Sequence, residues 1–378
     1  MKKEIRIGLI GVGSMGRTHA FAIRSLPFYC KDLPFRATLA GVAAGHPENA
    51  RHAAEEWDVP FAAENENELI ESANIDVIDI CTPNVFHFEA VQKALLAGKS
   101  VYCEKPLCGD PKMAAKLCEL SAGRTCGVVF NNRFLPAVLR AKSLIDEGAL
   151  GRILEFSFSY LHDSAADAQK PMGWKQTAVI CGEGGVLFDL GSHIIDLALF
   201  LCGPICAVTG KSQIAFPKRL GPDKKETKTD APEAFYLTVR TKEGAYGTLT
   251  ASKLATGTQD DLSFRISGTK GALSFSLMNP NVLSFYDATA STGAFGGLAG
   301  FTGIATGGRY PAPDGAFPSP KAPLGWLRGH VMSYASFLRT VSREKAEFHP
   351  DFSDALRVEE VMAAALCSDK NGREETIL

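Results

Sequence analysis

A glycine-rich turn near the start of the sequence constrains the fold more than any other feature. Residues 5–10 form an apolar run that predicts a buried strand, a G-x-G-x-x-G turn follows at once, and a helical pattern begins directly after it. The first glycine permits a tight turn, the second lets the backbone approach a pyrophosphate, and the third lets the helix pack on the strand. This context predicts a dinucleotide site with the phosphates at the helix N-terminus. The residues expected at the cofactor are Gly11, Gly13, Ser14, Met15 and Gly16.

Strands and helices alternate through the rest of the N-terminal part of the chain. Four further apolar runs of strand length follow the first, and segments of helical period separate them. These runs lie at residues 38–42, 77–81, 100–103 and 127–130. Such alternation predicts an α/β architecture with a doubly wound parallel sheet of the Rossmann type. We therefore predict a dinucleotide-binding domain over residues 1–130.

A cation closes the fourth of these strands. Glu104 and Lys105 follow the apolar run, and Pro106 comes next. Proline has no N–H to donate to a strand ladder, so the strand must stop there and present its end to solvent or to a ligand. Ligands of open α/β sheets bind outside the carboxyl ends of the strands, where Lys105 would lie. Taken alone, the segment Glu104-Lys105-Pro106 fits a solvated lysine in a turn better than a catalytic one. The prediction that Lys105 is catalytic therefore depends on the neighbouring motifs.

The loop after the third strand is aimed at the same edge of the sheet. It begins at Thr82 and precedes a helix that starts near His87. Carboxyl ends of parallel strands share one edge, so this loop and the segment around Lys105 are expected to approach one cofactor. For His87, a contact with the cofactor and a surface role at the helix start fit the sequence equally well. We expect cofactor contacts from Thr82, Pro83, Asn84, His87, Glu104 and Lys105.

The end of the second strand lacks a residue that NAD-binding folds usually have. A carboxylate there accepts hydrogen bonds from the ribose hydroxyls of NAD and repels the 2′-phosphate of NADP. This sequence has Ala44, Gly45 and His46 instead. His46 and Arg51 could offer hydrogen bonds or positive charge to that phosphate, although both could equally be solvated helix residues. We expect NAD or NADP as the cofactor, favour NADP, and count Ala44 and His46 among the cofactor-binding residues.

The pattern changes after residue 130. One helix is expected over residues 137–147, and runs with period-two alternation then follow. These runs lie at residues 153–160, 235–240, 246–252, 264–267 and 272–277. A glycine turn at residues 268–271 joins two of them as a hairpin. Strands in such succession predict an antiparallel sheet, so we expect residues 131–378 to form a second domain of the α+β class.

One helix of the second domain carries titratable side chains in a row. It is expected over residues 184–203, and Asp189 and His193 lie four residues apart, which places them on one face. Asp196 follows three residues later. Gly191 inside the helix costs about 1 kcal/mol relative to alanine, which indicates that something packs closely there. The row fits an acid and a base at a catalytic site, and it also fits a structural histidine with capping acids.

The composition points to small molecules as partners. Of 378 residues, 46% are hydrophobic and 22% charged, and the formal net charge is −2. A balance so near neutrality gives no basic field for nucleic acid or for a membrane surface. No apolar run is long enough to cross a bilayer, and the first one ends too early for a signal peptide. We expect a soluble, cytoplasmic protein that binds neither nucleic acid nor membrane.

The ten cysteines are scattered singly, several of them inside apolar runs. Free cysteine in such a run behaves as a small buried hydrophobe, so a disulfide framework is not expected. Cys202 and Cys206 flank a turn, but no further histidine or cysteine stands near them to complete a zinc set. We therefore expect no metal site.

A Gly- and Pro-rich segment covers residues 288–325. It reads as one long loop, and loops of that length in a compact domain are usually functional covers or poorly ordered. We expect it to cover the substrate or a subunit contact. Two helices are expected after it, over residues 328–341 and 352–368.

Taken together, these motifs make the chain resemble the glucose-fructose oxidoreductase and inositol dehydrogenase (Gfo/Idh/MocA) family over essentially its whole length. The family's glycine fingerprint, its Thr-Pro-Asn loop, its Glu-Lys-Pro segment and its Asp-x-Gly-x-His-x-x-Asp helix occur here in the same order and at the same spacing. The resemblance implies a Rossmann domain followed by an α+β domain with a large, mostly antiparallel open sheet. It also implies hydride transfer between a nicotinamide cofactor and a hydroxyl or keto carbon of a sugar, polyol or cyclitol.

The resemblance further implies roles for three residues. In the family, the lysine of the Glu-Lys-Pro segment and the Asp and His of the later helix line the place where substrate meets nicotinamide. They match Lys105, Asp189 and His193 here. Histidine titrates near neutrality, so His193 is the expected base, Lys105 would stabilise the alkoxide, and Asp189 would bind substrate or set the charge of its neighbours.

Substrate contacts and assembly are implied in the same way. The sugar is expected to contact Asn132, Arg133, Tyr160, His162, Trp174 and Lys175. The open sheet of the family often mediates assembly, so a homodimer or homotetramer is expected. Some relatives cleave glycosides by transient oxidation and elimination, and others bind nucleotide only to regulate transcription. Both alternatives stay open, although a pure sensor would not need the base and the cation together.

Overall fold

Two compact units make up the protein. The computed structural model describes residues 2–221, 225–297, 299–311, 314–342 and 349–377. The first unit consists of Met1–Phe134 and Gly308–Arg357, and the second of Leu135–Gly307 and Val358–Leu378. The predicted domain ranges, 1–130 and 131–378, stay a prediction. By packing, a late segment joins the N-terminal part, because helix α9 (Leu327–Ser342) lies against helix α1 (Ser14–Tyr29).

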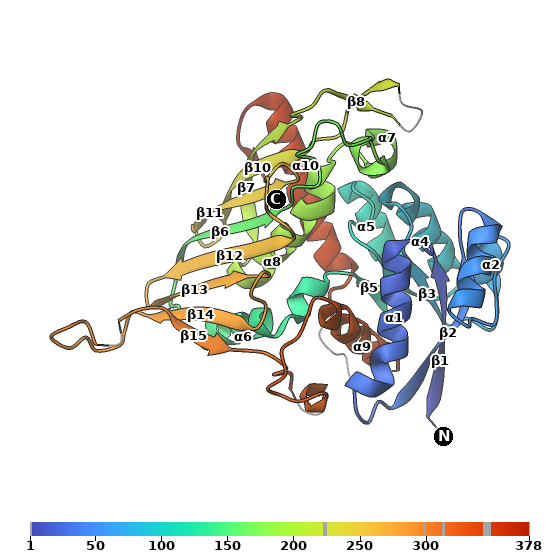
Figure 1. The fold of residues 1–378 in the computed structure, drawn as a ribbon, viewed down its shortest axis with the longest axis horizontal. Coiled ribbons are helices and arrows are strands. Elements are labelled where there is room, and N and C mark those ends of the chain that lie inside the picture. The colour runs from blue at the N-terminus through green and yellow to red at the C-terminus, as the bar shows by residue number, and fades with distance from the viewer. Residues whose placement is uncertain (1, 222–224, 298, 312–313, 343–348, 378) are drawn as a thin grey trace. The chain divides into compact units, whose positions relative to one another are not determined.

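The first unit is built on a five-stranded sheet in which every strand pair is parallel (Figure 1). Its strands are β1 (Lys3–Ile10), β2 (Phe35–Ala43), β3 (Val77–Ile80), β4 (Ser100–Cys103) and β5 (Cys126–Val128). They lie in the order β2-β1-β3-β4-β5, which confirms the predicted doubly wound sheet. The chain order reverses between β1 and β3, and sheets of this kind bind ligands at such a switch point, beyond the carboxyl ends of the strands.

Helices pack along this sheet in two groups. One group places α3, α4 and α5 side by side, and the other places α9 beside α1, as the brown and blue helices of Figure 1 show. The remaining bounds are α2 (Pro47–Glu56), α3 (Glu66–Glu71), α4 (His87–Leu96) and α5 (Pro111–Leu120). Phe337 of α9 stacks on Tyr102 of β4 with ring centroids 4.8 Å apart, and the Tyr102 hydroxyl lies 2.6 Å from Ser333 Oγ. Helix α9 is thereby fixed to the strand that ends before Lys105.

The second unit is built on a nine-stranded sheet, antiparallel except where β6 pairs with β11. The strand order is β15-β14-β13-β12-β6-β11-β10-β7-β16. The strands are β6 (Ile153–Leu161), β7 (Ile205–Gln213), β10 (Ala234–Thr241), β11 (Tyr246–Ser252), β12 (Asp261–Gly268), β13 (Gly271–Ser276), β14 (Val282–Asp287), β15 (Thr302–Ala305) and β16 (Glu375–Thr376). This architecture confirms the predicted mostly antiparallel α+β fold. A separate two-stranded ribbon pairs β8 (Lys218–Leu220) with β9 (Glu226–Lys228).

One face of the large sheet is covered by helices. Phe156, Phe158 and Tyr160 alternate along β6 and are all buried, and helix α8 (Ser192–Cys202) packs on this strand. The other helices of the unit are α6 (Pro136–Asp146), α7 (Ala178–Cys181) and most of α10 (Phe352–Asn371). The period-two pattern of the sequence therefore reports real burial, since side chains of a strand alternate between the two faces.

The Gly- and Pro-rich segment is not a single loop, so that expectation is wrong in part. Residues 288–297 and 299–301 form an extended arm after β14, on which Phe295 is completely exposed (Figure 1). Strand β15 then returns to the sheet, and the 3-10 helix Asp314–Ala316 belongs to the first unit. Leu298, Ala312 and Pro313 of this segment lie outside the described residues.

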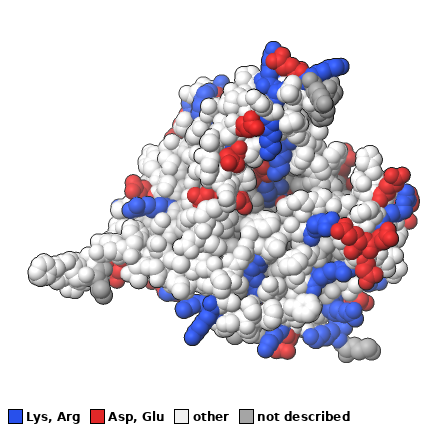
Figure 2. Space-filling view, in the orientation of Figure 1, with Lys and Arg blue, Asp and Glu red and all other residues white. Residues whose placement is uncertain are grey.

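Charged side chains of both signs are mixed on the face shown in Figure 2. Around α2, Arg17 Nη1 lies 2.8 Å from Glu56 and Arg51 Nη1 lies 2.7 Å from Glu64. The arm at residues 288–301 contains no charged residue and stands out as a white projection. Among the described helices, none is both long enough and apolar enough to span a membrane.

Candidate active site

The glycine loop after β1 has the geometry that a dinucleotide needs. Gly11 has a φ of +100°, and a Cβ there would come within 2.7 Å of the Cys81 backbone. A Cβ on Gly16 would collide with the carbonyl oxygen of Gly11, so helix and turn can pack this closely only without a side chain. At Gly13, in contrast, a Cβ would meet no atom within 4 Å. The backbone at Gly13 is therefore open to a ligand, at the N-terminus of α1, where phosphates are favoured.

His87 links the two neighbouring loops of this edge. Its Nδ1 lies 2.8 Å from the Pro106 carbonyl oxygen, and its Nε2 lies 2.9 Å from the Thr82 carbonyl oxygen. Burial lowers the pKa of His87, so the neutral ring donates to one of these carbonyls. The expected contact between His87 and the cofactor stays a prediction, but the ring already holds the loop after β3 against the loop after β4.

Lys105 leaves the end of β4 beside a buried carboxylate. The backbone N–H of Lys105 donates to Oε2 of Glu104 at 3.1 Å, and Glu104 is only 6% exposed. Burial by itself would raise the pKa of Glu104, but the hydrogen bond and charge of His19, together with Lys105, lower it to about 2. Glu104 is therefore an anion at neutral pH.

His19 of α1 lies next to the predicted site residue Glu104 and was not singled out from the sequence. Its ring is fully buried, with Nδ1 3.0 Å from both carboxylate oxygens of Asp79 and Nε2 3.2 Å from Oε1 of Glu104. Asp79, at the end of β3, also accepts a 2.6 Å hydrogen bond from the Tyr334 hydroxyl. A histidine among the small apolar residues on the buried face of a helix is interpreted as a core residue, so no sequence signal distinguished His19 from its neighbours. Ligand atoms of His19, Asp79 and Cys81 lie within 4.8 Å of one another, a grouping that could also hold a metal ion.

Asp189 in the second unit lies between two lysines. Lys175 Nζ is 3.0 and 2.9 Å from its two oxygens, and Lys253 Nζ is 2.8 Å from Oδ2. Lys253 is buried, and it was missed although it directly follows β11, much as Lys105 comes two residues after β4. A cation at a strand end was the signal that could have found it. The carboxylate of Asp189 is thus held by charge-assisted hydrogen bonds.

The helix that carries Asp189 and His193 is not regular. The chain is helical from Val186 to Cys202, so the expected helix over residues 184–203 is present, but Leu187–Gly191 within it is a π-helical segment and the regular α-helix α8 starts at Ser192. A Cβ at Gly191 would lie 2.8 Å from Leu187 Cδ1, which is the close packing expected there. Single-turn π-bulges are rare and often occur at functional sites.

His193 lies at one end of a row of polar rings. It is 9% exposed, and its ring centroid is 5.8 Å from that of Tyr160, which in turn is 5.3 Å from that of His162. His162 Nε2 lies 2.7 Å from Oδ1 of Asp260, a carboxylate that the sequence analysis did not single out. Burial comes first among the causes that raise the pKa of Tyr160, followed by the Asp260 carboxylate, so its hydroxyl stays protonated.

The other predicted residues fall into two environments. Asn132 and Arg133 are buried in the 3-10 helix Asn131–Phe134, where Arg133 Nη1 lies 3.4 Å from Oδ2 of Asp354. Trp174 is 45% exposed, and Lys175 Nζ lies 5.5 Å from the centre of its ring. Of the predicted catalytic residues, Lys105 belongs to the first unit, and Asp189 and His193 belong to the second.

The cofactor-selecting region after β2 is open. Ala44 is half-buried, while Gly45 and His46 are exposed, and His46 is the N-cap residue of α2. Arg51 is paired with Glu64 at 2.7 Å. None of residues 44–46 has a carboxylate side chain. The acid that NAD-binding folds usually have after the second strand is therefore absent from these positions.

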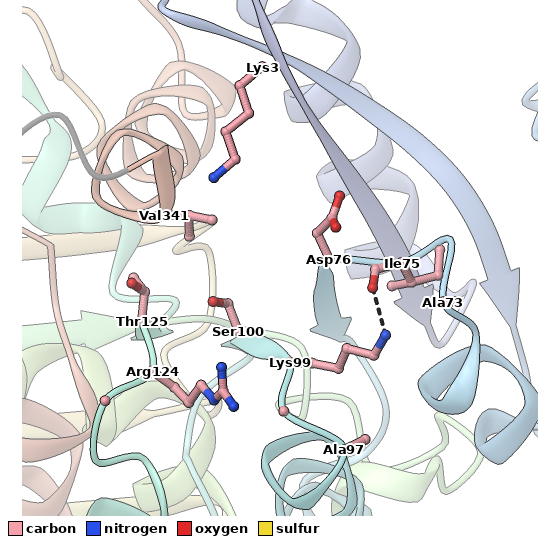
Figure 3. Close-up of a pocket in the computed structure, with 12 residues that line it drawn as sticks. Lys3, Ala73, Ile75, Asp76, Ala97, Lys99, Ser100, Arg124, Thr125 and Val341 are labelled. Atoms are coloured by element: carbon pink, nitrogen blue, oxygen red, sulfur yellow. Dashed lines mark hydrogen bonds between the residues drawn. The ribbon is translucent and has the colours of Figure 1, made fainter.

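A hollow of about 480 Å³ lies at the other end of the first sheet (Figure 3). Lys3 and Ser100, the first residues of β1 and β4, line it together with Asp76, Lys99 and Arg124. Lys99 Nζ donates to the Ile75 carbonyl oxygen at 2.7 Å, the dashed line in Figure 3. Because these residues stand at the amino ends of the strands, the hollow is separate from the edge that carries the glycine loop and Lys105.

Both halves of the chain match models of one protein family. Residues 5–131 match the model described as the oxidoreductase family with an NAD-binding Rossmann fold. Residues 138–274 match the GFO/IDH/MocA C-terminal domain.

Individual relatives match over almost the full length. The levoglucosan dehydrogenase of Pseudarthrobacter phenanthrenivorans is 30% identical, with 94% of each chain covered. The solved structure of a levoglucosan dehydrogenase in complex with NADH and levoglucosan has a TM-score of 0.93 at 29% identity and covers 100% of both chains. An NAD-binding oxidoreductase from Klebsiella pneumoniae has a TM-score of 0.92 at 30% identity, with 99% of each chain covered.

The two lysines on Asp189 should differ in their effect on stability. Lys253→Met removes a buried hydrogen bond between charged groups and should lower the free energy of unfolding by about 1–3 kcal/mol. Lys175→Met is the matched control, since its side chain is 45% exposed and an exposed pair is worth about 0–1 kcal/mol. Urea denaturation measures both variants. Equal losses would contradict the assignment of Lys253 as the internal partner of Asp189.

Proposed function

Because this chain belongs to the GFO/IDH/MocA family of oxidoreductases, we propose that it oxidises one hydroxyl-bearing carbon of a sugar, polyol or cyclitol. It is an NAD-binding oxidoreductase that acts on CH–OH groups. The proposal rests chiefly on Lys105, a cation at the end of a parallel strand in the unit that also contains the open glycine loop. The levoglucosan dehydrogenase, similar over its full length, supports a carbohydrate as the substrate class.

The chemistry assigns a task to each proposed catalytic residue. Oxidation removes a hydride from carbon and a proton from oxygen, and the bound nicotinamide supplies the acceptor for the hydride. We propose that His193 accepts this proton, because the ordinary pKa of histidine lies near neutral pH, which suits a general base. Lys105 would donate a hydrogen bond to the same oxygen and stabilise its negative charge as the hydride leaves.

Asp189 has a supporting task in this proposal. Its carboxylate pairs with the ammonium groups of Lys175 and Lys253 and so holds both in place. Each ammonium group can also donate a hydrogen bond to a substrate hydroxyl. Lys175 is the more exposed of the two and lies against Trp174, an exposed indole on which the apolar face of a sugar could pack. We therefore keep these two residues as proposed substrate contacts, with Asn132, Arg133, Tyr160 and His162 as further candidates.

We propose that the cofactor site admits NADP as well as NAD, with NADP favoured. The region after β2 has no carboxylate at residues 44–46, so a 2′-phosphate would meet no repulsion from that position. Glu64 engages Arg51, whereas His46 is exposed at the N-terminus of α2, where a phosphate is favoured. This combination supports His46 rather than Arg51 as the partner of the phosphate.

We also propose a homodimer or homotetramer that forms through the uncovered face of the nine-stranded sheet. Tyr236 and Thr238 of β10 and Tyr246 and Thr248 of β11 are exposed, while their neighbours along each strand are buried. The strand register places all four on one face. Exposed tyrosines there can bury a large area at small entropic cost, as in many protein interfaces.

Catalysis is tested by two substitutions. His193→Ala and Lys105→Ala should each lower turnover by about 10²–10⁴-fold, the range that general acid–base catalysis contributes. NAD binding should persist in the His193 variant. Reduction of the nicotinamide, followed by its absorbance with a panel of sugars and cyclitols, measures the rate. His52→Ala and Lys116→Ala, at exposed helix positions, are the matched controls. Near-normal turnover in either main variant would refute the assigned role.

Cofactor choice is tested by titrating NAD and NADP into the protein. NADP should bind at least as tightly as NAD, and Ala44→Asp should weaken NADP because it restores the repulsive carboxylate. If NAD binds more than about tenfold tighter in the unsubstituted protein, a gap of about 1.4 kcal/mol, the preference for NADP is wrong.

Assembly is tested by the mass in solution. The double variant Tyr236→Glu, Tyr246→Glu should sediment as a smaller species, because like charges would face each other across the proposed contact. Phe28→Glu, an exposed phenylalanine on α1, is the control. An unchanged mass in the double variant, or a monomeric parent protein, would contradict assembly through this sheet.

A further inference from the structure

His19 carries a charge in the interior of the first unit. Both ring nitrogens face carboxylate oxygens: Nδ1 lies 3.0 Å from Asp79, and Nε2 lies 3.2 Å from Glu104. Ionised carboxylates only accept hydrogen bonds, so both nitrogens must donate for the two contacts to be favourable. A neutral imidazole has one N–H, whereas the imidazolium has two. The geometry therefore points to a doubly protonated His19.

The groups around the ring agree with this state. Burial opposes the charge on His19, but the Asp79 carboxylate and its hydrogen bond raise the pKa of His19 well above its ordinary value. A second imidazole, that of His330 on α9, lies 5.9 Å away between ring centroids, and burial followed by the His19 charge lowers its pKa to about 3. His330 is therefore neutral. Two anions, Asp79 and Glu104, are thus balanced by His19 and by the neighbouring Lys105.

Three further neighbours of the ring add no charge. Tyr334 donates to Asp79 at 2.6 Å, and burial keeps its hydroxyl and that of Tyr102 protonated by raising both pKa values. Burial likewise raises the pKa of the Cys81 thiol, whose Sγ lies 3.2 Å from Nδ1 of His19. A metal ion at this cluster would need a deprotonated ring nitrogen and a thiolate, and both are disfavoured here. The imidazolium explains the same contacts without either change.

Glu104 connects this charge to Lys105. One oxygen of its carboxylate faces His19, and the other accepts the backbone N–H of Lys105 at 3.1 Å. We propose that His19 is a positioning residue, whose doubly protonated ring holds Glu104 ionised and in place and thereby fixes the backbone from which the Lys105 side chain reaches the reacting hydroxyl. This proposal rests on the proposed role of Lys105 in oxidation. It assigns a function to a residue of the cofactor-loop helix that does not touch substrate.

The protonation state is tested on the unsubstituted, full-length protein. Uniform ¹⁵N labelling of the eight histidines, with His19→Asn to assign one signal, reports whether each ring nitrogen carries a proton. Both nitrogens of His19 should stay protonated at pH 8, where an ordinary histidine with a pKa of about 6.5 is neutral. A neutral ring at pH 7 would overturn the proposal, whatever the outcome of the Lys105→Ala experiment.

The coupling to Lys105 is tested by pH profiles of turnover. His19→Asn should lower kcat by about 10²-fold, the cost of a small misplacement of a catalytic group, while the dissociation constant for NAD stays near that of the parent. Without the imidazolium, burial would raise the pKa of Glu104, so this carboxylate would take up a proton as the pH falls. The acid limb of the profile should therefore move to higher pH in the variant.

Two further variants separate positioning from a merely structural role. Glu104→Gln should lower kcat without moving the acid limb, and the double variant His19→Asn, Glu104→Gln should lose no more than the worse single variant. His19→Gln, which also lacks the positive charge of the imidazolium, serves if His19→Asn fails to fold, and it should shift the acid limb in the same direction. His52→Asn, with an 80% exposed side chain, is the control. Additive losses, or reduced stability with an unchanged pH profile, would refute the positioning role.

Discussion

A buried set of charges at the carboxyl edge of the first sheet is the constraint on which the unit depends. Charges taken out of water are costly unless they are paired and hydrogen-bonded. His19 of α1 lies between Asp79 at the end of β3 and Glu104 after β4, and Tyr334 of α9 donates a further hydrogen bond to Asp79. Four elements are therefore held in one arrangement. The loops that follow β1, β3 and β4 then leave the sheet at the same edge, where the strand order reverses and ligands bind.

Much of this edge could be predicted from sequence because glycine and proline mark where its strands end and its turns begin. Gly11, Gly13 and Gly16 permit a turn that side chains would block, and Pro106 ends a strand because it lacks an N–H. The hydrophobic pattern identified both sheets, because a strand buried on two faces is a continuous apolar run and a strand buried on one face alternates apolar and polar residues. These local signals place Lys105 at this edge, while its catalytic role stays a prediction that depends on the neighbouring motifs. All of them act over a few residues, which is the range at which a single sequence can be interpreted.

The missed features depend on partners distant in the chain. His19 and Tyr334 meet at Asp79 across more than 250 positions, and nothing near His19 in the sequence reveals the two carboxylates. The π-helical segment before α8 was missed because its spacing of residues fits an ordinary helix equally well. The place of α9 beside α1 was missed because an amphipathic helix does not specify which sheet it covers. Lys253 is different: it comes directly after β11, so part of the signal used for Lys105, a cation at the end of a strand, was present and was not applied, although no proline follows Lys253.

The central claim is that the nicotinamide and the reacting hydroxyl meet at Lys105. A crystal structure of the protein with NAD and an unreactive substrate analogue tests it most directly. The predicted result has the pyrophosphate at Gly13 and the Nζ atom of Lys105 within about 3 Å of the hydroxyl oxygen on the carbon that faces the nicotinamide ring. A nicotinamide bound away from the end of β4, or a hydroxyl that contacts His193 but not Lys105, would contradict it.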